Sequence, residues 1–162
     1  MILTKRMNIK RIISIVVAVV ALCNIASAQT IALDEKTPRL RRDAKWLNDH
    51  RPEKSEFTYL AFIHSASISC QASTEFIYNI LNKYDNVTFI LISHQSAENI
   101  DQWVTEYQGT HSGVIVDDTH TRTSFGVNYA PYAVLLNHKR RAIWFGNPQL
   151  LDARIIEELL EE

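Results

Sequence analysis

Apolar residues gather in short runs along the chain. Phe57 to Ile63 (FTYLAFI) is almost wholly apolar, and Val87 to Ser93 (VTFILIS) is a second such run, rich in β-branched residues. Short runs of this kind predict strands that are buried on both faces of a sheet. Gly113 to Val116 predicts a third, shorter strand. Tyr132 to Leu136 and Arg141 to Phe145 surround a polar turn of four residues, which predicts a β-hairpin.

Stretches with helical periodicity separate these strands. A first helix is predicted to open at about Cys70 and to stop at Asp85, with an apolar stripe of Phe76, Ile77, Ile80, Leu81 and Tyr84. A second is predicted with Ser96 as its N-cap and Gly109 after its end. Its apolar face would be Ile100, Trp103, Val104 and Tyr107.

Two further helical segments complete the pattern. Asp118 to Ser124 predicts a polar turn or a short helix, and Pro148 can open a last helix. The apolar face of this last helix would be Leu151, Ile155, Ile156, Leu159 and Leu160. Strands that alternate with helices indicate parallel pairing through crossovers, and the closing hairpin adds antiparallel edges. We therefore predict an α/β domain over residues 57–162, with a mixed central sheet covered by helices on both faces.

The first 28 residues have the pattern of a secretory signal peptide. Four basic residues precede an apolar run from Ile12 to Leu22, and Ala26-Ser27-Ala28 offers a cleavage site before Gln29. The run is shorter than the ~20 apolar residues that a membrane-spanning helix needs. We therefore expect an exported, periplasmic protein of a bacterium without a stable membrane anchor. Residues 29–56 would form an N-terminal lead-in, of which Gln29 to about Arg42 is polar and should lie on the surface, with a basic cluster from Arg39 to Arg42.

Composition excludes several classes of protein. The sequence is 46% apolar and 22% charged with only four Gly and four Pro, which excludes disordered and collagen-like chains. Residues 29–162 hold 13 basic and 18 acidic side chains, a formal charge of −5, which argues against nucleic-acid binding. They also hold a single cysteine, Cys70, so no internal disulfide and no thiolate zinc cluster can form there. We expect neither a metal nor a cofactor.

A buried strand that runs through a tight turn into a helix with cysteine at its start resembles the thioredoxin superfamily. The motif of that family is C-x-x-C, preceded by a stretch such as F-W-A-x-W. Here Phe62 to Ala66 (FIHSA) precedes Ser67 to Cys70 (SISC) without gaps. Phe125 to Tyr132 (FGVNYAPY) is similar to the family's segment with a cis-proline loop, and Ala142 to Pro148 (AIWFGNP) resembles the end of secreted TlpA-like redoxins. The resemblance implies a thioredoxin-like fold.

The same resemblance implies a site. Ala130 and Pro131, with Pro131 cis, should lie beside Ser67 and Cys70 and bind an extended substrate. In the family, the first cysteine of the motif attacks a disulfide as a thiolate. Ser67 stands in that position, and a hydroxyl stays protonated near neutral pH, so the dithiol cycle should be lost. Ala61 also replaces the buried acid that thioredoxins keep six residues before the first cysteine.

Three roles remain open for Cys70. It can be one more buried apolar side chain, as free cysteines often are. It can keep monothiol exchange chemistry, favoured by the dipole of the helix that it opens. It can also act as in peroxiredoxins, because a thiol three residues after a hydroxyl resembles their T-x-x-C motif. For that role Ile63 stands where the family has proline, and the peroxide-binding arginine would be Arg122, Arg140 or Arg141.

The remaining polar residues have simpler readings. The six histidines (50, 64, 94, 111, 120 and 138) show no metal-binding spacing, and His64 could tune Cys70 by charge. Asp117 and Asp118 could hold a cation or start a helix.

The sequence and the resemblance leave two hypotheses for the function. The protein is either a thiol–disulfide oxidoreductase-like protein with partial chemistry at Cys70, or a redox-inactive module that holds a peptide or protein partner in the groove at Pro131.

Overall fold

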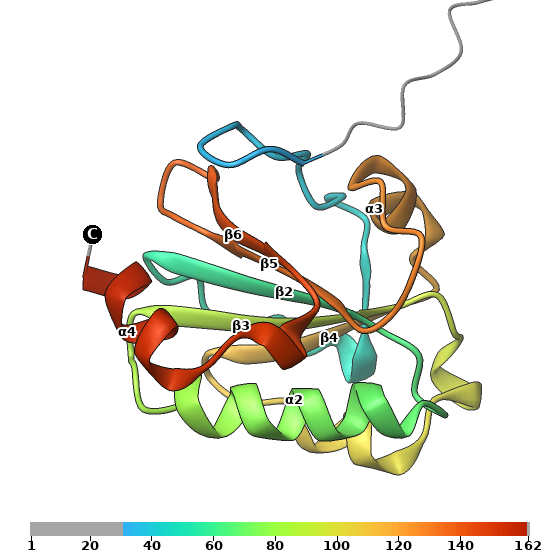
Figure 1. Ribbon diagram of the computed structural model, residues 1–162. Coiled ribbons are helices and arrows are strands. Elements are labelled where there is room, and N and C mark those ends of the chain that lie inside the picture. The colour runs from blue at the N-terminus through green and yellow to red at the C-terminus, as the bar shows by residue number, and fades with distance from the viewer. Residues whose placement is uncertain (1–30, 162) are drawn as a thin grey trace, which may run out of the picture.

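The computed structural model describes residues 31–161, so the expected signal peptide lies outside the described residues. Its centre is a six-stranded sheet in the order β1-β4-β3-β2-β5-β6 (Figure 1). The strands are β1 (Lys45–Trp46), β2 (Phe57–Ile63), β3 (Val87–Ser93), β4 (Ser112–Val116), β5 (Tyr132–Leu136) and β6 (Ala142–Gly146). β2, β3 and β4 are parallel, whereas β1, β5 and β6 pair antiparallel with their neighbours. The predicted mixed sheet and its closing hairpin are confirmed.

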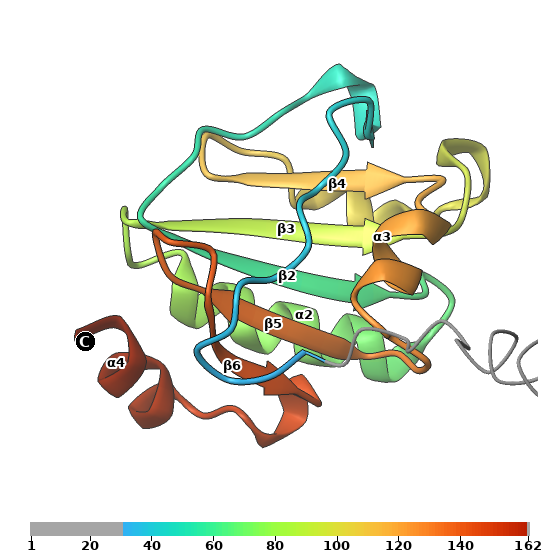
Figure 2. The same cartoon turned by 90° about the horizontal axis from the view of Figure 1, so that it is seen from above.

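Both faces of the sheet are covered. The helices α2 (Ile68–Leu81) and α4 (Ala153–Glu161) pack on one face, while α3 (Thr119–Ser124) and the segment before β1 cover the other (Figures 1 and 2). Side chains of β2 alternate between two apolar clusters, with Ala61 and Ile63 facing α2 and Leu60 and Phe62 facing away. All residues of β3 are buried, as the continuous apolar run predicted.

Most of the predicted apolar stripe of α2 is confirmed, since Ile77 and Leu81 are buried and Ile80 and Tyr84 pack against the core. The buried residues of the helix are Cys70, Ser73, Thr74, Ile77 and Leu81, which follow helical spacing from Cys70 onward. Phe76 lies off this stripe and is 52% exposed, so its prediction as a core residue was wrong. The helix also ends at Leu81, before the predicted stop at Asp85.

The predicted helix after Ser96 was also wrong. Two short 3-10 turns stand there instead, η2 (Ala97–Asn99) and η3 (Gln102–Glu106), separated by extended backbone at Ile100 and Asp101. The Ser96 hydroxyl accepts a hydrogen bond from the Asn99 side chain rather than capping a helix. The bend allows Val104 to be buried and Trp103 to reach the turn before α2, so tertiary packing overrides the helical periodicity.

The two ends of the domain differ in detail from the expectation. The lead-in is more than a surface segment, because Ile31 and Leu47 are buried and the two-residue strand β1 pairs with β4. A 3-10 turn, η1 (Leu47–Asp49), follows β1. Pro148 opens the 3-10 turn η4 (Pro148–Leu150), and α4 begins only at Ala153. Within residues 31–161, no helix has the length and apolar character to cross a membrane.

Candidate functional site

The turn between β2 and α2 places a hydroxyl at the start of a helix and a thiol beneath it. Ser67 is the N-cap of α2, and its Oγ accepts a hydrogen bond from the backbone N–H of Cys70 at 3.3 Å. Cys70 is fully buried, and its Sγ lies 3.5 Å from the backbone N of His64, which donates to it. The thiol therefore belongs to the core beneath α2, while the half-buried Ser67 borders the surface.

Two side chains from the chain after β3 hold this turn. The Gln95 side-chain oxygen accepts from the Ser65 N–H at 2.7 Å, and the Trp103 indole donates to the Ser65 carbonyl at 2.8 Å. The Ser65 hydroxyl is buried and has no hydrogen-bond partner within the described residues. From the sequence, Trp103 was predicted to lie on the apolar face of a helix, and Gln95 was not predicted to take part in the site. No local pattern reveals contacts that span 30 or more residues.

Removing the indole N–H should loosen the turn. A Trp103→Phe variant leaves the Ser65 carbonyl without its donor, and an unsatisfied buried group costs about 1–3 kcal/mol. Urea unfolding should therefore show a loss of stability in that range. A Trp144→Phe variant serves as control, because Trp144 makes no side-chain hydrogen bond within the described residues. Equal destabilisation by both changes would contradict this role for Trp103.

The loop before β5 meets the same end of the sheet. Tyr132 pairs with Phe62, so Pro131 lies across from the end of β2, close to the turn that follows Ile63. The Ala130–Pro131 peptide bond is cis, and Ala130 packs against the core cluster that contains Cys70. The start of α2 and the loop before β5 share one end of the molecule (Figure 1). Cys70 and Ala130 thus belong to one apolar cluster, and Pro131 lies at the same end of the sheet as Ser67.

A small basic cluster borders this end. The rings of His64 and His94 lie 5.4 Å apart, and the Arg122 guanidinium is 3.5 Å from Nδ1 of His94. Partial burial, the positive charge of Arg122 and the His64 ring lower the pKa of His94, in that order. Of the three arginines considered for a peroxide, only Arg122 lies here.

Other candidates lie elsewhere or have structural roles. Arg140 and Arg141 follow β5 in the hairpin, at the opposite end of the sheet, so neither can serve Cys70. Asp118 caps α3, where its carboxylate accepts from the N–H and the hydroxyl of Thr121, and Asp117 pairs with Lys45. No cluster of three or more potential metal ligands occurs among residues 31–161.

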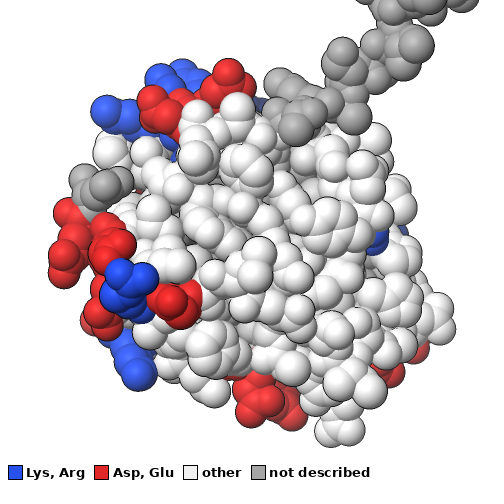
Figure 3. Space-filling model, in the orientation of Figure 1, with Lys and Arg blue, Asp and Glu red and all other residues white. Residues whose placement is uncertain are grey.

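Exposed apolar side chains lie next to the turn and next to the loop. Ile68, directly after Ser67, is 84% exposed, and Tyr129, next to Ala130, is 52% exposed. Figure 3 shows a broad face in which Lys, Arg, Asp and Glu are confined to the margins. Exposed apolar side chains beside a loop are suited to contact an extended peptide.

No family model matches this chain, and no curated protein matches it either. Several solved structures are similar to this chain. The chain is similar to DsbF of Mycobacterium tuberculosis, with a TM-score of 0.58, 17% identity and coverage of 72% of this chain and 92% of that one. It is also similar to the thioredoxin domain of a thiol-disulfide oxidoreductase from Bacteroides vulgatus, with a TM-score of 0.61, 12% identity and coverage of 82% and 98%. A thiol peroxidase from Chromobacterium violaceum gives a TM-score of 0.62, with 13% identity over 83% and 88% of the two chains. The protein has a thioredoxin-like fold.

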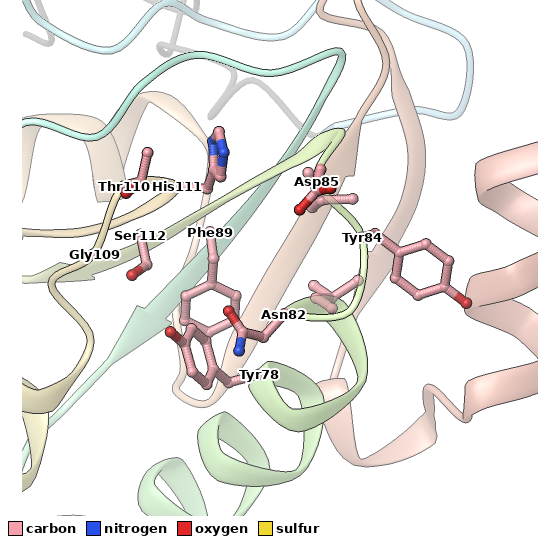
Figure 4. A pocket seen from close by; sticks show the side chains of 11 residues that line it. Tyr78, Asn82, Tyr84, Asp85, Phe89, Gly109, Thr110, His111 and Ser112 are labelled. Carbon is pink, nitrogen blue, oxygen red and sulfur yellow. The ribbon is translucent and has the colours of Figure 1, made fainter.

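A separate pocket of about 240 Å³ lies at the other end of this thioredoxin-like domain. It is formed by the end of α2 and the starts of β3 and β4, with Tyr78, Asn82, Asp85 and His111 around it (Figure 4). Asn82 lies twelve positions after Cys70 along the helix and its cap, a distance of about 18 Å at ~1.5 Å per residue. The pocket therefore takes no part in chemistry at the thiol.

Proposed function

We propose that this protein is an exported, redox-inactive thioredoxin-like protein that holds an extended peptide segment of a partner at the turn of Ser67 and the loop of Pro131. The observation that carries the proposal is the burial of Cys70, whose side chain is inaccessible to a substrate disulfide. A thiol must be reached by its partner, because exchange proceeds by direct attack of a thiolate on sulfur.

The position of Ser67 supports the loss of dithiol chemistry. By the resemblance to C-x-x-C, Ser67 stands at the nucleophile and Cys70 at the resolving position. The Ser67 hydroxyl is used as a helix cap, and a hydroxyl forms no mixed disulfide. One similar structure is described as a thiol-disulfide oxidoreductase, and another was solved in mixed oxidized and reduced forms. These descriptions support a comparison of Ser67 and Cys70 with a reactive pair of thiols.

Peptide binding is supported by the surface rather than by the thiol. Ile68, next to Ser67, and Tyr129, next to Ala130, are both exposed apolar side chains. An extended chain can satisfy backbone groups of the loop by strand-like pairing while its apolar side chains contact these two residues. Export rests on the leader, with its basic start, apolar run and small-residue cleavage site.

The test uses reduced, carboxymethylated insulin B chain as an extended, partly apolar probe. Two-dimensional NMR titration should shift signals of Ile68, Tyr129 and Ala130 and leave those of α4 unchanged. Ile68→Asp and Tyr129→Asp should each weaken binding about tenfold or more, because apolar contact is replaced by a charge. The matched control is Leu33→Asp, since Leu33 is 62% exposed on the lead-in. Equal loss in the control, or shifts that map elsewhere, would contradict the proposal.

A further inference from the structure

A groove lies on the sheet face opposite α2, at the end of β2 remote from the turn of Ser67. Its volume is about 260 Å³. The floor is formed by strands β2, β3 and β5 through Leu60, Ile90 and Leu136. The lead-in, which crosses the sheet in Figure 2, forms one wall, and the segment before β2 forms the other. The groove is thus separate from the proposed peptide site.

Four basic side chains surround this groove: Arg39, Arg51, Lys54 and Arg140. No Asp or Glu of the described chain lines it, and none of the four pairs with a carboxylate of residues 31–161. By contrast, four other basic residues do form such pairs: Arg41, Lys45, Arg141 and Arg154. Since residues 29–162 carry a net charge of −5, the groove is a local excess of positive charge in an acidic chain.

Two of these cations are oriented by their neighbours. The Arg51 guanidinium lies 6.0 Å from the ring centroid of Trp46, which lines the groove. Arg140 donates to the carbonyl of Thr37 at 3.2 Å, which leaves the other N–H groups of its guanidinium available. These contacts therefore restrict the positions of both guanidinium groups at the groove.

The rest of the lining is mostly apolar. Half-buried Pro38, Leu40, Trp46 and Pro52 form the walls above the buried floor. Gly113 keeps this wall close to β4, because a Cβ at that position would lie 2.6 Å from Cδ of Pro52 and 3.0 Å from the Trp46 ring. The groove therefore combines an apolar base with a positively charged rim.

We propose that this groove binds a small amphiphilic anion, namely a carboxylate on a single unbranched aliphatic tail. The guanidinium groups match a carboxylate through charge-assisted hydrogen bonds. The apolar walls and floor suit the tail. The volume lies just below the ~300–1,000 Å³ of usual ligand pockets, which limits the tail to medium length.

The test is isothermal titration calorimetry with octanoate as the probe. Octanoate should bind to a single site, and its affinity should fall as ionic strength rises. Octan-1-ol and octylammonium should bind at least tenfold more weakly. Hexanoate should also bind more weakly than octanoate, by roughly fourfold per methylene removed. The fluorescence of Trp46 should change on binding, and a Trp46→Phe variant should lose that signal.

Variants that remove positive charge test whether octanoate binds in this groove. The double variant Arg51→Gln/Lys54→Gln should weaken octanoate at least tenfold, and both side chains are exposed, so the fold should be kept. The matched control is Lys83→Gln, an exposed lysine outside the groove, which should bind like the wild type. The proposal is overturned by equal binding of octylammonium, by an unchanged double variant, or by no octanoate binding at millimolar concentration. It is also overturned if phosphatidylglycerol vesicles bind through these residues and octanoate does not, since the groove would then recognise a lipid surface.

Discussion

A Ser67→Cys variant should reduce the disulfides of insulin in the presence of dithiothreitol, whereas the wild-type protein should not exceed the rate of dithiothreitol alone. Ser67 caps α2, and its Oγ already lies 3.3 Å from the backbone N of Cys70. A thiol in that place would border the surface at a helix N-terminus, where the thiolate is favoured. It would also lie one helical turn from Cys70, within the range in which disulfides close.

A Ser69→Cys variant is the matched control for this gain of activity. Ser69 is exposed on the same turn and also adds a second thiol, but it is adjacent to Cys70 in the chain and points to another side of α2. Ser69→Cys should therefore show no turnover. If both variants reduce insulin equally, any added thiol suffices and the geometry of Ser67 is irrelevant. If Ser67→Cys folds but neither forms a disulfide nor reduces insulin, the turn is not an active-site turn.

Ile77→Ala should destabilise the protein by about 2–5 kcal/mol, the cost of truncating a fully buried side chain. The neighbouring Phe76→Ala should change stability by only about 0.5 kcal/mol, because the Phe76 ring is 52% exposed. Urea unfolding followed by circular dichroism measures both. Because Phe76 has the larger side chain, equal losses would show that it is buried in solution and that α2 is rotated about its axis.

The strands could be predicted from sequence because each one is a short apolar run. In β2 and β3 nearly every residue is buried, so the apolar pattern is continuous and its reading as a doubly covered strand was correct. The hairpin of β5 and β6 was predicted for a similar reason, since a polar turn separates two apolar runs. These features depend on local composition alone.

Other parts depend on contacts that local composition does not reveal. The periodicity from Ile100 to Tyr107 is helical, yet the chain bends at Ile100 so that Trp103 can donate to Ser65. The strand β1 has two residues and gives no periodic signal. At the site, the sequence motif identified Ser67 and Cys70. The hydrogen bond from Ser65 to Gln95 and the contact between Arg122 and His94 could not be predicted, because the fold brings together residues that are distant in the sequence.

The reactivity of Cys70 in the folded wild-type protein tests the central claim most directly. The measurement is the rate of iodoacetamide labelling at neutral pH, followed by mass spectrometry of the peptide that contains Cys70. Since the thiol is fully buried, labelling should require unfolding. With a typical stability of at least ~5 kcal/mol, the rate in buffer should be roughly a thousandfold or more below that in urea. Labelling in buffer as fast as that of the Ser67→Cys thiol would contradict the redox-inactive assignment.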